Sequence, residues 1–299
     1  MKPHSVASAL TSALTGDGRA LVTFPDLATN LERREAGIWF SKSRSAVSYP
    51  SHGNQACYQI EDNSFWFQHR NRVITSLVGT FPPAGPLFDI GGGNGFVALA
   101  LQKAGWQTVV VEPGLTGAMN ARHRGLENVV CATLEDTDFR KHSLAAVGIF
   151  DVLEHIENAE QFLRTTRELL VERGRIYITV PAYQLLWSPE DQLAGHFCRY
   201  SLGSLTSQMR SAGFEVEFAS YIFALLPLPI FLRRALPSWL GLHTDAPNAG
   251  AEHQTGAEHQ IRSVAVQKVM DRVFRWELRR LERQIPIPFG GSCVVVVRS

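Results

Sequence analysis

The sequence lacks cysteine pairs, an excess of charge of one sign and a long apolar run. Its four cysteines are scattered without a Cys-x-x-Cys pair, so neither a zinc site nor a disulfide framework is predicted. Lys and Arg number 29 against 28 Asp and Glu, a formal net charge of +1, which disfavours a general polyanion binder. The longest apolar stretch, 221–232, is broken by prolines and is too short to span a bilayer. Without a signal-peptide pattern, we expect a cytoplasmic protein with reduced thiols.

Segments of strand length alternate with helical segments along most of the chain. Hydrophobic residues make up 45% and charged residues 19%, a composition typical of globular domains rather than of disordered chains. Apolar strands are predicted at 86–90, 108–111, 128–132, 145–151, 175–180, 214–221 and 292–298. This alternation predicts an α/β fold whose mainly parallel sheet is covered by helices on both faces.

Two helices are expected before the first strand. Thr29 and Asn30 are residues that cap helices, so a short helix is predicted to start at Leu31. A second helix, with aromatic residues on one face, is predicted over 58–77. Another helix is predicted over 159–172.

The residues between the strands at 214–221 and 292–298 do not fit the alternation. An apolar segment, 222–242, contains prolines and the pair Arg233 and Arg234. A low-complexity stretch, 244–260, is predicted to be a loop, and a helix is predicted over 261–284. Apolar surface beside basic residues suits three roles, which stay open here: a lid over an apolar pocket, contact with a membrane or amphiphilic substrate, or an oligomer contact.

A glycine turn follows the first strand of the alternation. Asp89, Gly91, Gly93 and Gly95 have the spacing Asp-x-Gly-x-Gly-x-Gly, with Gly92 between them. Glycines at a strand end let a ligand approach the backbone closely, and the following helix N-terminus favours an anionic group. A dinucleotide fingerprint requires a third glycine at position 96, where this chain has Phe96. The spacing therefore disfavours an NAD-dependent oxidoreductase.

This glycine spacing and the strand ends after it resemble the class I S-adenosylmethionine-dependent methyltransferases. The resemblance places Glu112 and Pro113 at the ribose of the cofactor, and a carboxylate suits two adjacent hydroxyls. It places Thr133 and Leu134 at the adenine. The family often has Asp where this chain has Thr133, so Glu135 or Asp136 is an alternative contact. Beside the methionine moiety it places Phe150, Asp151 and Val152.

The resemblance also implies an architecture. It implies a Rossmann-like sheet of seven strands, the last antiparallel, within a methyltransferase domain at 58–299. Residues 1–57 then form a helical N-terminal extension, and an insert at 222–284, on the substrate side, precedes the last strand.

Segments flanking the glycine turn resemble a bacterial subgroup whose members often modify sugars, lipids or metabolites, frequently on oxygen. By this likeness, Phe67 and Arg70 close over the cofactor, with Arg70 directed at its carboxylate. The alternative is a core helix with a surface arginine. Residues 181–201 resemble the same subgroup and follow a strand at the edge where α/β sheets bind ligands.

Three side chains are candidates for the methyl-transfer step. His155 and His196 are candidate bases because imidazole titrates near neutrality, and Tyr200 is a candidate for positioning a hydroxyl. The alternative roles are structural: shaping the cleft for His155 and stapling a loop for the other two. Asp151, Glu154 and His155 also resemble the Glu-x-x-Glu-His segment that is associated with a divalent metal in quinone-pathway O-methyltransferases. We expect no metal, because similar segments occur in many metal-free relatives.

The sequence therefore predicts S-adenosylmethionine-dependent methylation of a small molecule, most readily on oxygen. An NAD-dependent oxidoreductase, an RNA methyltransferase and a non-catalytic S-adenosylmethionine-binding homologue remain alternatives. No nucleic-acid partner is expected, because the net charge is near zero and an Asn/Asp-Pro-Pro-Tyr motif is absent. The acceptor molecule and the oligomeric state stay open.

Overall fold

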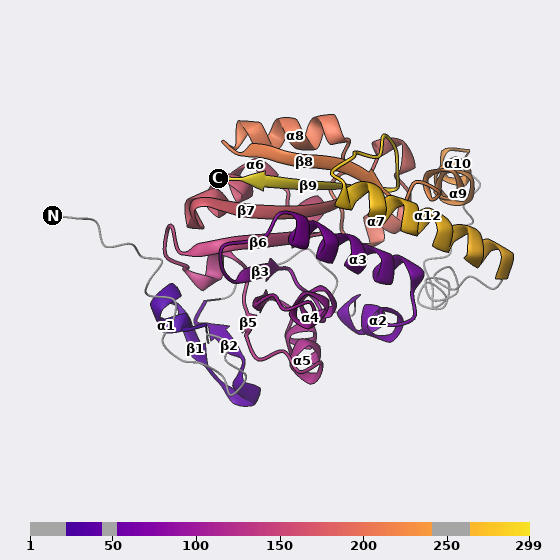
Figure 1. The fold of residues 1–299 in the computed structure, drawn as a ribbon. Helices are drawn as coiled ribbons and strands as arrows, with labels where there is room; N and C mark the ends of the chain where they lie inside the picture. Colours follow the sequence, from indigo (N-terminus) through magenta and orange to yellow (C-terminus); the bar gives the residue numbers. More distant parts are fainter. Residues whose placement is uncertain (1–21, 44–52, 241–263) are drawn as a thin grey trace.

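The computed structural model describes residues 22–43, 53–240 and 264–299. Within these ranges the strands form one mixed sheet in the order β1-β2-β5-β4-β3-β6-β7-β9-β8 (Figure 1). The strands are β1 Leu31–Arg33, β2 Trp39–Ser41, β3 Leu87–Ile90, β4 Thr108–Val111, β5 Val129–Cys131, β6 Leu144–Phe150, β7 Leu170–Pro181, β8 Glu215–Ile222 and β9 Ser292–Arg298. The predicted loop at 244–260 lies outside the described residues.

The central part of the sheet confirms the predicted architecture. Five strands, in the order β5-β4-β3-β6-β7, pair in parallel. Strand β9 pairs antiparallel with both β7 and β8. The order of these seven strands gives the mainly parallel α/β sheet that we expected, with an antiparallel last strand. Strands β1 and β2 were not predicted, and they extend the sheet beyond β5 because β2 pairs in parallel with it.

The helix predicted from Leu31 is wrong, because this segment is strand β1. The side chains expected to cap a helix bond elsewhere in the fold: Asn30 Nδ2 donates to the carbonyl of Asp136 at 2.7 Å, and the Thr29 hydroxyl donates to Asp138. Cross-strand pairing with β2 supplies the backbone hydrogen bonds that a helix would otherwise provide. Tertiary contacts therefore override the local capping signal.

Helices cover both faces of the sheet, and alternate residues of the strands point to each. On β9, Val295 and Val297 belong to the core under α6 and α8, whereas Val294 and Val296 belong to the core under α3 and α12. The longer helices are α2 Gly53–Ile60, α3 Phe65–Thr80, α4 Phe96–Lys103, α5 Leu115–His123, α6 Ala159–Leu169, α8 Leu202–Ser211 and α12 Val264–Glu282.

Two helices, α2 and α3, precede β3 where the sequence predicts a single helix over 58–77. Helix α2 ends at Ile60, and α3 begins after Ser64, whose side chain accepts a hydrogen bond from the Phe67 N–H at 3.4 Å. An N-cap serine satisfies one of the free N–H groups of a first turn, so it fixes the start of α3. The expected boundary between residues 57 and 58 falls inside α2.

Two further elements start or stop away from their predicted limits. The helix predicted over 159–172 ends at Leu169, because the chain then enters β7 at Leu170. The segment predicted as apolar and proline-broken forms three consecutive short helices, α9 Pro227–Ile230, η6 Phe231–Ala235 and α10 Leu236–Trp239. No helix of the described residues is long and apolar enough to cross a membrane.

Candidate active site

A cavity of about 880 Å³ lies at the carboxyl ends of the central strands. Its wall combines the ends of β3, β4, β5 and β6 with α2, α3 and the short helices α9 and η6. All the predicted cofactor residues line it: Phe67, Arg70, Asp89, Gly91, Gly92, Gly93, Glu112, Pro113, Thr133, Leu134, Phe150, Asp151 and Val152. The fold therefore gathers at one place residues that are far apart in the sequence.

The turn after β3 has a backbone that only glycine tolerates at two key positions. Gly91 has a φ of +66°, and a Cβ there would lie 2.6 Å from Val152 Cγ2. Gly95 has a φ of +73°, and a Cβ there would lie 2.4 Å from Leu126 Cδ1. Both are left-handed conformations in which side chains are strained. Gly91, Gly92 and Gly93 of this turn line the cavity, whereas Gly95 lets the chain pack closely against Leu126.

Asp89, at the start of this turn, is a buried carboxylate with unused hydrogen-bonding capacity. It is 1% exposed, and its Oδ2 has no hydrogen-bond partner among the described residues. Burial raises the pKa of Asp89 to about 7, and the positive charge of Arg70 opposes that shift. A buried acceptor without a partner is costly, so this oxygen is suited to a donor or positive group of a bound molecule.

Glu112, directly after β4, is held by the backbone of two glycines. Its two carboxylate oxygens accept from the Gly93 N–H at 2.9 Å and from the Gly114 N–H at 2.7 Å. Burial raises the pKa of Glu112 above its ordinary value, and these bonds oppose that rise. The carboxylate is thus fixed beside the glycine turn, where the resemblance places the ribose.

Sequence reasoning missed the polar network that holds α2 over this end of the cavity. Asn54 Nδ2 donates to Glu112 Oε1 at 3.2 Å, and Asn94 Nδ2 donates to Glu61 Oε1 at 3.0 Å. Arg124 Nη2 donates to the other oxygen of Glu61 at 2.9 Å. Position 54 fell in the expected extension, and no local pattern singles it out, because its partner is 58 residues away.

The loop after β5 shows which acidic residue faces the cavity. Thr133 Oγ1 accepts from the Asp136 N–H at 3.1 Å, so this hydroxyl fixes the turn. Leu134 is buried beside it. Of the two acidic alternatives to Thr133, Glu135 is exposed and lines the cavity, whereas Asp136 is buried and is not part of the lining.

Arg70 on α3 meets Asp151 at the end of β6. Its Nη1 donates to Asp151 Oδ2, and both side chains are mostly buried. The guanidinium lies 4.8 Å from the ring centre of Trp66 and 5.3 Å from that of Phe67, so aromatic rings also hold it in place. Arg70 therefore lies in the cavity wall as predicted, but in this structure its partner is a side chain of the protein.

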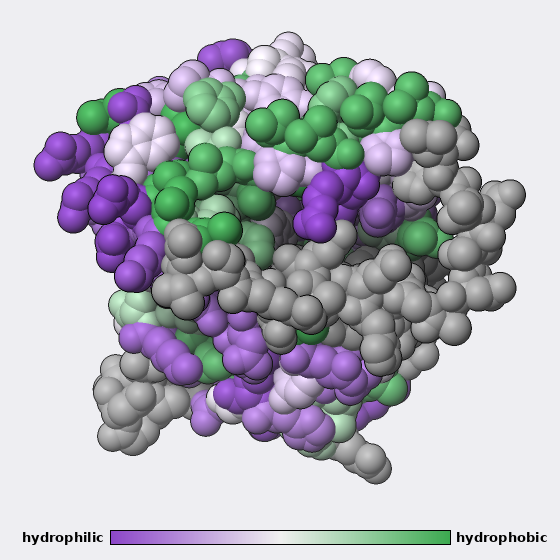
Figure 2. Space-filling view, turned by 90° about the vertical axis from the view of Figure 1, so that its right-hand side faces the viewer, coloured by the Kyte–Doolittle hydropathy of each residue, from purple (hydrophilic) through white to green (hydrophobic). Residues whose placement is uncertain are grey.

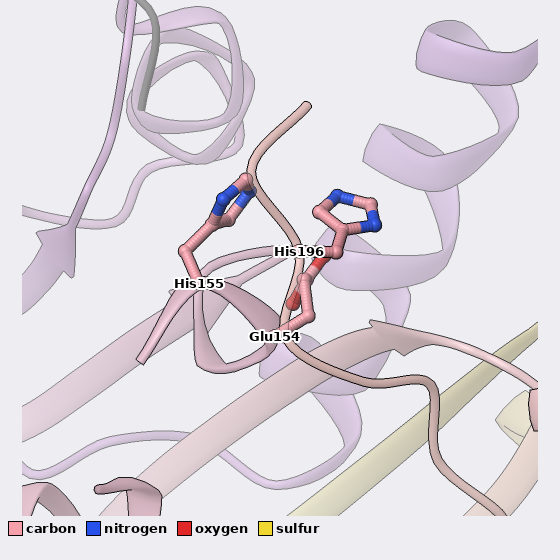
Figure 3. A group of neighbouring side chains, drawn as sticks. All are labelled: Glu154, His155 and His196. Atoms are coloured by element: carbon pink, nitrogen blue, oxygen red, sulfur yellow. The ribbon is translucent and has the colours of Figure 1, made fainter. Parts of the chain in front are cut away.

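His155 and His196 lie side by side in the cavity wall with Glu154 (Figure 3). Their ring centres are 4.7 Å apart, nearly perpendicular. Burial lowers the pKa of His155 to about 4, and the neighbouring His196 adds to this shift. His155 is therefore neutral at physiological pH and is a weak proton acceptor, although it was one of the two predicted bases.

His196 has the arrangement expected of a base. Its Nδ1 lies 2.9 Å from Asp191 Oδ1, and Arg199 Nε donates to the same oxygen at 2.8 Å. Burial by itself raises the pKa of Asp191, but hydrogen bonds from His196 and Arg199 outweigh it and lower the pKa to about 2. Because an ionised carboxylate only accepts, Nδ1 carries the proton, and Nε2 of a neutral ring keeps its lone pair.

Among the described residues, Glu154 and the two histidines form a group with the geometry of metal ligands. Glu154, His155 and His196 each offer one ligand atom, and these atoms lie within 4.8 Å of one another. Asp151, the first residue of the predicted metal-like segment, instead pairs with Arg70. Burial and the nearby charge of Asp151 raise the pKa of Glu154 well above its ordinary value.

Tyr200 does not reach the cavity lining. It is 6% exposed, and its hydroxyl donates to the Leu153 carbonyl at 3.4 Å. Its backbone N–H bonds to the carbonyl of Pro181. These contacts fit the structural alternative, in which Tyr200 fastens the loop that carries His196 and Arg199.

Comparisons with known proteins show the family of the chain. A family profile described as a methyltransferase domain matches residues 58–218, more than half of the chain. The chain belongs to this family of methyltransferases. With the glycine turn and acidic strand ends described above, it is a class I, S-adenosylmethionine-dependent enzyme. No curated protein matches the sequence.

Solved structures of low sequence identity resemble this methyltransferase. Phosphoethanolamine N-methyltransferase 2 of Haemonchus contortus, solved with S-adenosyl-L-methionine, is 16% identical with a TM-score of 0.52; the match covers 87% of this chain and 61% of that one. A methyltransferase of Archaeoglobus fulgidus is 16% identical, with a TM-score of 0.48, over 79% of this chain and 100% of that one. The [4+2]-cyclase SpnF is 16% identical, with a TM-score of 0.49, and the match covers 79% of this chain and 83% of that one.

Proposed function

We propose that this methyltransferase methylates an oxygen of a small-molecule acceptor, such as a metabolite, a sugar or a lipid-linked compound. The observation that carries the proposal is His196, which is oriented by Asp191 at 2.9 Å and lines the same cavity as the glycine turn. When bound, S-adenosylmethionine supplies an electrophilic methyl group on its sulfonium. The protein then has to bind, orient and deprotonate.

The cofactor half of the cavity has groups suited to the ribose, the positive charge and the carboxylate of that molecule. Gly91 and Gly93 leave room at the turn, and Glu112 is placed to accept from the ribose hydroxyls. Asp89 offers a negative charge, because its raised pKa of about 7 falls when a positive group binds beside it. Arg70 would bind the carboxylate of the methionine moiety by exchanging its bond to Asp151.

The acceptor half supports removal of a proton from oxygen. His196 Nε2 takes the hydroxyl proton as the oxygen bonds to the methyl carbon and the carbon–sulfur bond breaks. The resulting imidazolium is stabilised by the ionised Asp191, as in other histidine–carboxylate pairs. His155, which is neutral at physiological pH, adds no competing positive charge beside it.

The test is methyl transfer to a panel of hydroxylated acceptors, followed by mass spectrometry that locates the new methyl group. We expect His196→Gln to lower kcat by about 10²- to 10³-fold while affinity for S-adenosylmethionine changes little. Asp191→Asn removes the orienting charge and is expected to lower kcat less. A product methylated on nitrogen or carbon, or an unchanged kcat in His196→Gln, would contradict this proposal.

The alternative functions give different results in the same experiment. A non-catalytic homologue would bind S-adenosylmethionine and transfer nothing to any acceptor. An RNA methyltransferase would label bulk RNA instead of the acceptor panel. An oxidoreductase would bind NAD⁺, and Phe96 in place of the third glycine of the dinucleotide fingerprint argues against it.

A further inference from the structure

The short helices after β8 expose apolar side chains on consecutive turns. We name residues 225–240, which contain α9, η6 and α10, the roof segment. Among them only Ala235 is buried. Its exposed large apolar residues are Leu225 37%, Leu228 65%, Leu232 51%, Trp239 56% and Leu240 61%. Large apolar residues exposed together, rather than singly, mark an interaction surface.

The roof segment also forms part of the cavity wall. Leu226, Pro229 and Ile230 line the cavity, as do Arg233 and Arg234. The segment therefore presents both apolar and basic side chains to the cavity, and further apolar side chains to the outside. A lid over a pocket for a polar, freely diffusing acceptor needs only the first of these surfaces, so the outer one requires a separate explanation.

The charge of this region has one sign. Residues 218–240 contain two arginines and no acidic residue. Arg233 is exposed, as is Leu232 beside it in the sequence, and Arg233 also lines the cavity. Figure 2 shows this end of the molecule, where apolar surface at the height of α9 and α10 borders polar side chains. Apolar residues flanked by arginines are the combination that binds anionic lipid surfaces.

We propose that the roof segment docks this methyltransferase on an anionic lipid bilayer, from which the cavity receives an amphiphilic acceptor. Leu228, Leu232 and Trp239 enter the interface, and Arg233 meets the lipid phosphates. The acceptor's apolar part then passes along Leu226 and Ile230 toward the histidine pair. The docking stands independently, whereas the nature of the acceptor rests on the proposed function.

The test is flotation of the full-length protein with vesicles. One set contains phosphatidylcholine alone, and the other contains phosphatidylcholine and phosphatidylglycerol in equal parts. We expect binding to the mixed vesicles, weaker binding to the neutral ones, and loss of the difference at high salt. Because the assay needs neither cofactor nor acceptor, its failure is separate from failure of the proposed function.

Two variants and a control assign the binding to the roof segment. Leu228→Ser with Leu232→Ser removes exposed apolar contacts and is expected to weaken binding about 10-fold or more. Arg233→Gln with Arg234→Gln is expected to weaken binding to mixed vesicles about 10-fold and to spare neutral ones. Leu115→Ser, an equally exposed leucine on α5 outside the cavity lining, is expected to change nothing.

Folding and self-association are checked on the same samples. Thermal unfolding and the affinity for S-adenosylmethionine are expected to be unchanged in the leucine variant, since neither leucine lines the cavity. Equal binding of wild type and leucine variant to mixed vesicles would overturn the proposal. So would a wild-type dimer that binds no vesicles and dissociates with Leu228→Ser, because the roof segment would then be an interface between copies of the chain.

Discussion

At the scale of single residues, burial sets the chemistry of the cavity. Asp89, Glu112 and Glu154 are all nearly inaccessible to solvent, and burial raises the pKa of each. Asp191 is equally buried, yet hydrogen bonds from His196 and Arg199 keep its pKa at about 2. Burial therefore raises the pKa of the three carboxyl groups that line the cavity, whereas hydrogen bonds lower that of Asp191 behind His196.

The first prediction concerns Asp89. Its pKa of about 7 in the free protein means that most of the protein has a neutral carboxyl at pH 6 and an ionised one at pH 8. If the ionised form binds the positive cofactor, affinity for S-adenosylmethionine rises about 10-fold between these pH values. Calorimetric titration measures this change. S-adenosylhomocysteine lacks the sulfonium charge and is the matched control, for which we expect a smaller rise.

The second prediction concerns the stability effect of His155. Its folded pKa of about 4 lies below the ordinary value of 6.5, so the unfolded chain binds the proton more readily. The free energy of unfolding therefore falls as pH decreases from about 6.5 to 4, by at most a few kcal/mol. His155→Gln is expected to flatten this part of the pH profile in chemical denaturation. An identical slope in wild type and variant would contradict the assignment.

At the scale of elements, the sequence predicts the strands better than the segments before them. Strands β3, β4, β6 and β7 are apolar runs that end at a glycine, a proline or an acidic residue, so local pattern and final structure agree. The glycine turn and Glu112 could be placed for the same reason, because both directly follow such strands. Strands β1 and β2 have short, half-exposed sequences, and only pairing with β5 makes them strands.

The site residues that sequence reasoning missed depend on long-range contacts. Asn54 reaches Glu112 across 58 positions, and Asp191 acquires its role only when the loop brings His196 and Arg199 to it. Tyr200 lies beside Arg199 in the sequence, but its backbone forms a β-bridge with Ala182, and its side chain is buried in the core. Such outcomes follow from tertiary packing, which a local pattern does not encode.

The third prediction concerns the attachment of α12. Glu277 on this helix is completely buried, and its carboxylate accepts from the Phe223 N–H at 3.0 Å and the Ala224 N–H at 2.6 Å. His69 Nε2 on α3 lies 2.8 Å from the same carboxylate. We expect Glu277→Ala to lower the free energy of unfolding by about 3 kcal/mol, because it leaves these groups buried without a partner. Glu282→Ala, at an exposed position of α12, is the control and is expected to stay near wild type in the same denaturation assay.

At the scale of the whole molecule, the sheet joins two halves of one cavity. The ends of β3 and β4 supply the cofactor half, the segments after β6 and β7 supply the histidine pair, and the segment after β8 supplies the roof segment. Parallel strands bring their carboxyl ends to one edge of the sheet, so motifs far apart in the sequence meet there. Antiparallel β9 then returns the chain beside β7 and places Ser292 in the cavity wall.

The fourth prediction concerns metal. We expect methyl transfer to persist within about twofold after EDTA treatment and gel filtration, because proton removal by His196, which Asp191 orients, requires no metal ion at Glu154, His155 and His196. Metal content by mass spectrometry and activity on the same sample measure this. Loss of activity that added Mg²⁺ or Zn²⁺ restores, together with bound metal in wild type but not in Glu154→Gln, would show that the group is a metal centre.

The central claim is that the cavity binds S-adenosylmethionine through the glycine turn and Glu112. Calorimetric titration of folded wild-type protein with S-adenosylmethionine, S-adenosylhomocysteine and NAD⁺ tests it most directly, with Glu112→Ala and Glu282→Ala alongside. We expect micromolar binding of the first two ligands, none of NAD⁺, a loss of about 10- to 100-fold in Glu112→Ala, and no change in Glu282→Ala. Binding of NAD⁺ instead, or equal affinity in wild type and Glu112→Ala, would contradict this description of the site.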